Sequence, residues 1–133
     1  MRSLRSVVAA LLLAGIAGPA VPADGPADSA RAVVAAELEL APDLHLLRIG
    51  AGAYVVRHRC PFVCNSVLVE MPDGTFVFGG TPGFPEAAQL VLDWIVREHG
   101  RRPVVAIDTG YHFDNLGGNA AFRAAGFPVS GSD

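Results

Sequence analysis

The 133-residue sequence lacks a cluster of basic residues, an internal repeat and any low-complexity tract. Its 10 basic residues are outnumbered by 13 acidic ones, which gives a formal net charge of −3 at pH 7. Proteins that bind nucleic acid usually carry a basic patch or stripe on one face. The composition therefore argues against nucleic acid as a partner.

A full-length transmembrane segment is also missing, although the chain begins with apolar residues. Residues 1–23 contain two arginines, an uninterrupted apolar stretch from Val7 to Ala17, and small residues that end at Ala23. This order is typical of a secretory signal peptide, and the apolar stretch is too short for a comfortable membrane span. We expect cleavage after Ala23 and a periplasmic or secreted protein, with a retained membrane anchor as the alternative. No cysteine follows that cleavage site, which argues against lipid attachment there.

Removal of residues 1–23 leaves 110 residues, enough for one small hydrophobic core. The formal charge then becomes −5, from 8 basic and 13 acidic residues. Residues 24–43 are rich in alanine, proline and aspartate, and we expect them to form a loose N-terminal arm or a short helix. The folded domain is expected to cover residues 44–133.

Cysteine is scarce, since the chain has only Cys60 and Cys64, which flank the segment Pro-Phe-Val. In an exported protein this pair predicts a disulfide. A bridge needs the two Cα atoms within about 7 Å, and spacing alone does not give that distance. Two free buried thiols, or two soft metal ligands beside His58, are the alternatives.

The apolar pattern changes its period along the chain. Alternating or continuous apolar runs predict strands, and the i, i+3, i+4 spacing of apolar residues predicts helices. Strands are expected in residues 44–50, 53–58, 64–71, 75–80 and 102–108, helices in 85–100 and 117–126, and a last strand from 127. This order predicts an α/β fold, a mixed β-sheet with helices packed on it. Because the last strand has only begun at Asp133, we expect a fragment of a larger domain, with a natural short protein as the alternative.

The polar segment from Thr109 to Asn119, Thr-Gly-Tyr-His-Phe-Asp-Asn-Leu-Gly-Gly-Asn, directly follows a buried strand. In α/β proteins, ligands bind beyond the carboxyl ends of such strands. Side chains two positions apart share a face of an extended chain, which would bring His112 and Asp114 together as a zinc-compatible pair. A solvated histidine and an aspartate that caps the next helix are the alternative. Phosphate binding where Gly117 and Gly118 open the next helix has no nearby basic residue to support it.

Residues 44–133 resemble the N-terminal half of the metallo-β-lactamase-fold hydrolases, which form an αββα sandwich. The family's signature is His-x-His-x-Asp-His, preceded by a strand that ends in threonine and followed by Gly-Gly-Asn. His112 matches the second histidine and Asp114 the aspartate. The flanking matches are Thr109, Gly117, Gly118 and Asn119.

Three positions depart from the family's pattern. Gly110 replaces the first histidine, Asn115 replaces the last one, and Gly80 replaces an aspartate that supports the metal loop. One interpretation is a specialised enzyme, because the mono-zinc β-lactamases also lack the first and last histidines and bind zinc through the aspartate and two downstream ligands. The other is a relative that keeps the fold without zinc chemistry.

The resemblance implies a zinc-dependent hydrolase in which metal-activated water attacks an acyl or ester bond of a small-molecule substrate. Asp114 would hold the metal or orient the water, and His112 would act as a ligand or general base. Asn119 is expected to cap the helix that follows. A catalytic zinc needs three protein ligands, so we expect further ligands beyond Asp133, and weak zinc binding and no activity for this chain alone. The alternative function is a non-catalytic relative that binds a small molecule or a partner.

Overall fold

The computed structural model describes residues 36–59 and 61–131, and they contain one seven-stranded sheet with the strand order β1-β2-β3-β4-β5-β6-β7. From β1 to β5, each strand pairs antiparallel with the next one. The pairs β5–β6 and β6–β7 are parallel. The strands are β1 (Ala36–Ala41), β2 (Leu44–Gly50), β3 (Ala53–His58), β4 (Cys64–Glu70), β5 (Phe76–Gly79), β6 (Val104–Ile107) and β7 (Val129–Ser130). The predicted mixed α/β fold is confirmed.

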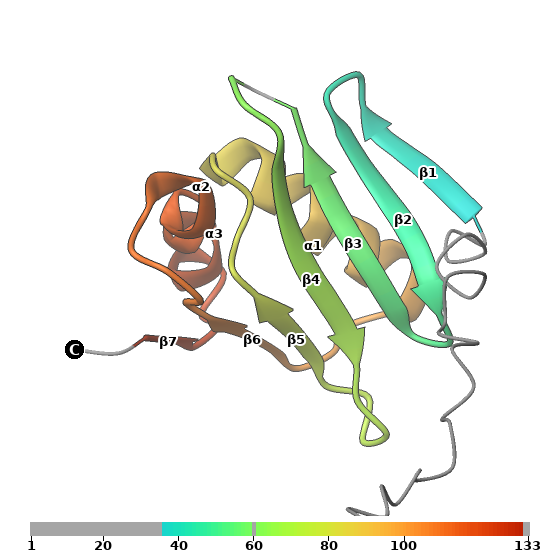
Figure 1. Ribbon diagram of the computed structural model, residues 1–133. Coiled ribbons are helices and arrows are strands. Elements are labelled where there is room, and N and C mark those ends of the chain that lie inside the picture. Colours follow the sequence, from blue (N-terminus) through green and yellow to red (C-terminus); the bar gives the residue numbers. More distant parts are fainter. Residues whose placement is uncertain (1–35, 60, 132–133) are drawn as a thin grey trace, which may run out of the picture.

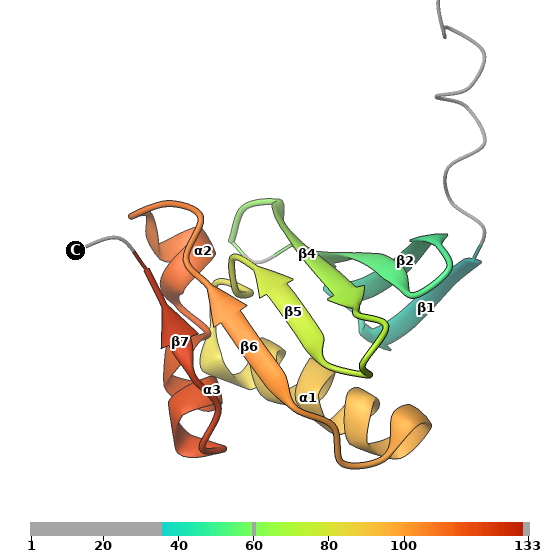
Figure 2. The ribbon, with the colours of Figure 1, turned by 90° about the horizontal axis from the view of Figure 1, so that it is seen from below.

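Helices connect the parallel strands. Helix α1 (Pro85–His99) joins β5 to β6, and α2 (Phe113–Leu116) and α3 (Asn119–Ala124) join β6 to β7. Figures 1 and 2 show α1 and α3 on the same face of the sheet, and α2 beyond the carboxyl end of β6. Among the described helices, none is long and apolar enough to cross a membrane.

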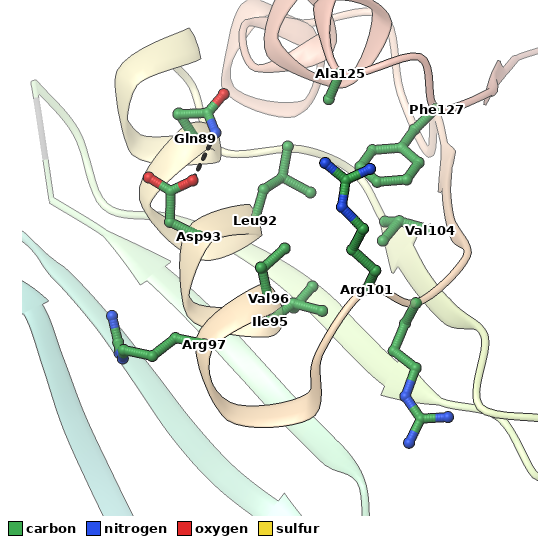
Figure 3. A pocket seen from close by; sticks show the side chains of 11 residues that line it. Gln89, Leu92, Asp93, Ile95, Val96, Arg97, Arg101, Val104, Ala125 and Phe127 are labelled. Carbon is green, nitrogen blue, oxygen red and sulfur yellow. Dashed lines mark hydrogen bonds between the residues drawn. The ribbon is translucent and has the colours of Figure 1, made fainter.

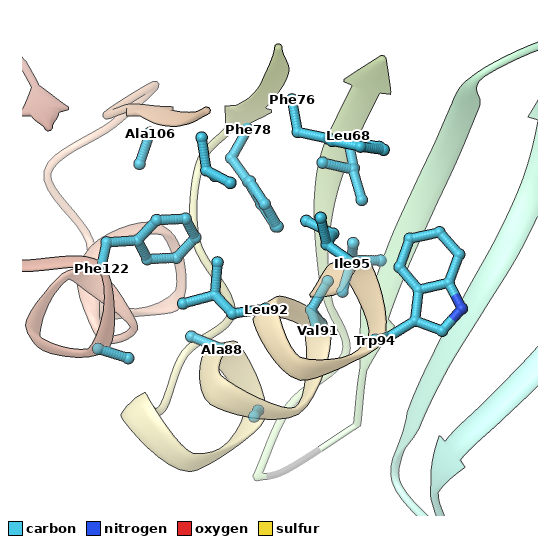
Figure 4. Packing of buried hydrophobic residues seen from close by; sticks show 14 of the residues in the cluster. Leu68, Phe76, Phe78, Ala88, Val91, Leu92, Trp94, Ile95, Ala106 and Phe122 are labelled. Carbon is cyan, nitrogen blue, oxygen red and sulfur yellow. The ribbon is translucent and has the colours of Figure 1, made fainter. Parts of the chain in front are cut away.

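The core lies between the sheet and α1. Every second residue of the strands points to this face, and α1 buries apolar residues at helical spacing, among them Val91, Leu92 and Ile95. The rings of Phe78 and Phe122 meet edge to face with their centroids 4.8 Å apart, which joins α3 to the same core (Figure 4). The strand residues of the core are Leu44, Leu46, Val56, Leu68, Phe76, Phe78, Val104 and Ala106.

The opposite face of the sheet also carries apolar side chains. Val67 pairs with Val55 and with Gly79, which in turn pairs with Ile107, so these positions form one row across four strands. Val67 and Ile107 are each 45% exposed. Apolar residues on both faces are typical of a sheet covered on both sides, as expected for one half of a four-layer sandwich.

The sheet begins earlier than the sequence analysis predicts. Residues Ala36–Ala41 form β1, in place of the loose arm or short helix that the sequence predicts up to residue 43. The alternation of Glu37 and Glu39 with Leu38 and Leu40 is a strand pattern, and the Glu37 carboxylate lies 3.0 Å from Nδ1 of His45 on β2. The predicted signal peptide, residues 1–23, and residues 24–35 lie outside the described residues.

Candidate functional site

The segment after β6 meets the end of β5. These two strands pair in parallel with Gly79 opposite Ile107, so their carboxyl ends reach the same edge of the sheet. The Gly80 N–H donates to the Ile107 carbonyl (2.8 Å), and the Thr81 N–H donates to the carbonyl of Asn115 in α2 (2.9 Å). Residues 109–119 are therefore attached to the β5 end as well as to their own strand.

A polar network fixes both ends of this segment. The Asn119 side-chain amide donates to both carboxylate oxygens of Asp108, at 3.0 and 3.1 Å. The Thr81 hydroxyl lies 3.1 Å from the Asn119 amide oxygen and 3.2 Å from the Asn115 carbonyl oxygen, so it donates to this pair of acceptors. Thr81 and Asn119 are buried. Through Asp108 and Asn119, the network connects the residue before the loop with the last residue of the loop.

Asn119 does not cap the following helix, and this prediction is wrong. It is the first residue of α3, the N-cap position belongs to Gly118, and no side chain caps the helix. The Asn119 side chain instead reaches back to the end of β6. Its partner Asp108 carries a charge that makes a stronger hydrogen-bond acceptor than an amide or hydroxyl oxygen.

His112 and Asp114 lie in the loop, but not on an extended chain. The Asn115 N–H donates to the His112 carbonyl (3.0 Å) and the Gly117 N–H to the Phe113 carbonyl (2.7 Å), which closes the short helix α2. His112 is its N-cap residue and Asp114 lies in its first turn, so our argument from strand alternation is wrong here. His112 is exposed and its ring lies 4.2 Å from that of Tyr111, while Asp114 is half-buried.

Gly117 and Gly118 are needed because the backbone of the loop approaches the start of α1. A Cβ atom on Gly117 would collide with the carbonyl oxygen of Gly83. A Cβ atom on Gly118 would lie 2.8 Å from both the Ala88 Cβ and the Pro82 carbonyl oxygen. Neither glycine has a positive φ, so close packing explains both residues and a special turn does not.

Cys64 lies close to the loop, which the sequence analysis did not foresee. A Cβ atom on Gly83 would be 3.8 Å from the Cys64 sulfur and 3.7 Å from the Asp114 Cα atom, so these residues surround the same glycine. Burial raises the pKa of the Cys64 thiol, and the Asp114 carboxylate raises it further. No local pattern signals this proximity, because it depends on how β4 and α2 are placed. In the part of the chain that the structure describes, Cys64 is a free, buried thiol that donates to the Phe62 carbonyl oxygen (3.6 Å). Cys60 lies outside the described residues, so the disulfide stays a prediction.

The loop does not provide a complete metal site by itself. Within residues 36–59 and 61–131, no group of three or more histidine, cysteine, aspartate or glutamate side chains could hold a metal ion. His112 and Asp114 are two side chains of the right chemistry, and a catalytic zinc needs three. Gly110 has no side chain to offer, and the amide of Asn115 is a poor zinc ligand.

Apolar side chains surround the loop. Phe62 and Val63, before β4, are 65% and 63% exposed, and Tyr111 and Phe113 are 83% and 50% exposed. The rings of Phe62 and Phe113 lie 6.3 Å apart between centroids. We call these four residues the apolar rim. Tyr111 also lines a cavity of about 250 Å³, together with Asp108, Thr109, Gly110, Leu116 and Gly131.

A larger groove, of about 600 Å³, lies between α1 and the segment after α3. Its floor includes Leu92, Val104 and Phe127, and the Arg101 side chain extends along it, as Figure 3 shows. No histidine or cysteine lines it, and its charged side chains are mainly arginines. The groove therefore lacks the pairing of a histidine with an aspartate that the loop has in His112 and Asp114. We treat the loop, and not the larger groove, as the candidate site.

Comparison with known proteins identifies the fold. No family model and no curated protein matches the chain. The solved structure of a metallo-β-lactamase from Erythrobacter litoralis, with β-mercaptoethanol in its active site, matches 71% of this chain with a TM-score of 0.61 and 20% identity. A metallo-β-lactamase from Pontibacter korlensis matches 68% with a TM-score of 0.60 and 23% identity. The chain spans 43% and 44% of these two proteins, and at such identities the likeness establishes the fold alone.

Proposed function

Starting from the metallo-β-lactamase fold of this chain, we propose that the loop from Thr109 to Asn119 is part of a zinc-dependent hydrolase site for small molecules with an acyl or ester bond. One observation carries the proposal. Asp114 and His112 lie beyond the carboxyl end of the parallel strand β6, where α/β proteins bind ligands, in a loop that hydrogen bonds fix at both ends.

The two side chains would have different tasks. The half-buried carboxylate of Asp114 would be a zinc ligand, and the exposed imidazole of His112 would be a second ligand or the base that takes a proton from the attacking water. Zinc, when bound, polarises a carbonyl group and lowers the pKa of its water to about 7. Because residues 36–59 and 61–131 offer two such side chains at the loop, a third ligand would come from outside these ranges.

Zinc content measured by mass spectrometry tests this proposal. We expect less than one zinc per molecule in the 133-residue chain, and one zinc in a chain extended by any codons that follow Asp133. In the extended chain, Asp114→Ala should abolish zinc binding and hydrolysis of a β-lactam or ester, and His112→Ala should lower turnover by roughly a hundredfold. Asp93→Ala, which removes an exposed carboxylate from α1, is the matched control. A zinc-free extended chain that is indifferent to Asp114→Ala would rule out this function.

The apolar rim favours a second candidate, a non-catalytic protein that binds an apolar ligand at the same loop. Four exposed apolar side chains beside a crevice are a surface that suits binding without any metal. In this case Tyr111→Ala and Phe113→Ala should each weaken the binding of an apolar fluorescent probe such as anilinonaphthalene sulfonate. Asp114→Ala should leave that binding unchanged, and unchanged binding in all three variants would exclude the rim as the site.

A further inference from the structure

The three positions that depart from the family's signature meet at one point in the structure. Gly80 follows β5, Gly110 follows β6, and Asn115 lies in α2. The Asn115 side chain packs over both glycines. A Cβ atom added to Gly80 would lie 2.9 Å from the amide oxygen of Asn115. A Cβ atom added to Gly110 would lie 3.6 Å from the amide nitrogen of the same side chain.

The space around Gly80 excludes a larger residue in two ways. Its φ of 72° lies in the left-handed region, which residues with a side chain rarely adopt. A Cβ atom there would also press on the Asn115 amide oxygen and on the Thr109 hydroxyl, which would be 3.1 Å away. An aspartate at position 80 would therefore strain the backbone and require the Asn115 amide to move from its present position.

The backbone of Asn115 takes part in the same junction. Its carbonyl oxygen accepts the hydrogen bond from the Thr81 N–H and lies within reach of the Thr81 hydroxyl. Asn115 thus connects α2 to the end of β5 through its backbone and fills the space between the two strand ends with its side chain. In the family's pattern, metal-binding histidines would occupy positions 110 and 115, and an aspartate that supports the metal loop would occupy position 80.

We propose that Asn115 is a positioning residue that holds the loop to the ends of β5 and β6 without a metal, and that it forms one coupled unit with Gly80 and Gly110. In this chain the Asn115 amide, packed on Gly80 and Gly110, fills the space that the first and last histidines of the signature would occupy. This inference does not depend on the proposed function, because a zinc held through Asp114 and outside ligands would be compatible with it.

Melting temperatures of glycine variants test the coupling. Gly126→Ala is the matched control, because Gly126 has a φ of 79° and no atom within 4 Å of an added Cβ. We expect the control to lower Tm by about 5–10 °C, and Gly80→Ala to lower it by at least about 5 °C more, because only Gly80→Ala adds a steric clash. In an Asn115→Ala background, this extra loss should fall by at least half, since the clashing amide is gone. Equal losses for both glycines, or an unchanged extra loss, would overturn the proposal.

Cobalt(II) uptake gives a readout that structural damage alone would not produce. Asn115→His and Gly110→His as single variants should not gain the visible absorption of protein-bound cobalt(II), because the other two positions remain unsuited to a metal. The triple variant Gly80→Asp/Gly110→His/Asn115→His should gain it. Uptake by a single variant, or a folded triple variant without uptake, would contradict the coupled unit. If the triple variant does not fold, the melting temperatures of the Gly80 and Asn115 variants decide.

Discussion

Replacing Asn119 by alanine removes the link between Asp108 at the start of the loop and Thr81 after β5. The side chain is 7% exposed and has all its hydrogen bonds inside the protein, two to the Asp108 carboxylate and one from the Thr81 hydroxyl. In Asn119→Ala, the Thr81 hydroxyl keeps the Asn115 carbonyl oxygen as an acceptor. The Asp108 carboxylate is half-buried and regains contact with water only in part.

The expected loss follows from these contacts. A hydrogen bond to a charged group contributes about 1.5–3 kcal/mol, and one between neutral groups about 1 kcal/mol. Because both bonds to Asp108 come from one amide nitrogen, we count them as one charge-assisted interaction. The sum predicts that Asn119→Ala lowers the free energy of unfolding by about 2.5–4 kcal/mol, a large part of the 5–15 kcal/mol that is typical of a domain.

Urea denaturation followed by the fluorescence of Trp94, the only tryptophan, measures this loss. Asn65→Ala is the control, because Asn65 is exposed on β4 and should change stability by less than about 0.5 kcal/mol. Thr81→Ala alone and combined with Asn119→Ala should show a coupling of about 1 kcal/mol between the two side chains. A loss below about 0.5 kcal/mol for Asn119→Ala would refute the structural role that we assign to the network.

Three further predictions concern processing, redox state and pH. Expression with the leader should give an exported protein that starts at Asp24, and a soluble cytosolic product starting at Met1 would contradict the signal peptide. After oxidative expression, mass spectrometry should find Cys60 and Cys64 two hydrogens lighter than the dithiol, and full thiol labelling without reduction would exclude the bridge. The hydrogen bond from the Thr75 N–H (2.9 Å) holds the pKa of Asp73 below its ordinary value. This carboxylate therefore stabilises the fold above its ordinary pKa, and the contribution is lost as the pH falls through the folded pKa. Thermal melts should show Asp73→Ala less stable than the native chain near pH 6, and the difference should shrink as the pH falls below the ordinary pKa of an aspartate.

Periodicity predicts most of this fold because burial and hydrogen bonding act locally on the elements concerned. Strands β2 to β6 alternate buried and exposed residues or are continuously apolar, and α1 combines helical spacing with a proline at its start and Gly100 after its end. The strand β1 carries the same alternation in Glu37 to Leu40. We missed it because its alanine-rich surroundings suggested an unstructured arm.

The geometry of the loop is less accessible from sequence. Whether Phe113–Leu116 forms a helix or an extended chain depends on contacts with Gly80 and Thr81, which are distant in sequence. The same is true of Asn119, whose side chain has two plausible partners, the helix that it begins and the strand end behind it. The side-chain nitrogen donates to Asp108, and the oxygen that could cap a helix accepts from Thr81 instead. The sequence alone does not show that either partner lies within reach.

Some residues that match the family's signature are required by the fold, and others are not explained by the fold and so bear on zinc binding. Gly117 and Gly118 are required by the backbone atoms of Gly83 and Pro82, and Asn119 by its hydrogen bonds, whether or not a metal binds. These matches therefore support the fold and carry no independent information on zinc. His112 is different, because it is exposed and its ring contacts only the exposed ring of Tyr111 among the aromatic pairs. No packing requirement explains a histidine at this position. A carboxylate in the first turn of a helix is favoured by the helix dipole, but this contribution is small in a helix of 4 residues. The case for a hydrolase therefore rests on His112 and Asp114, and the substitutions that test it belong at these two residues.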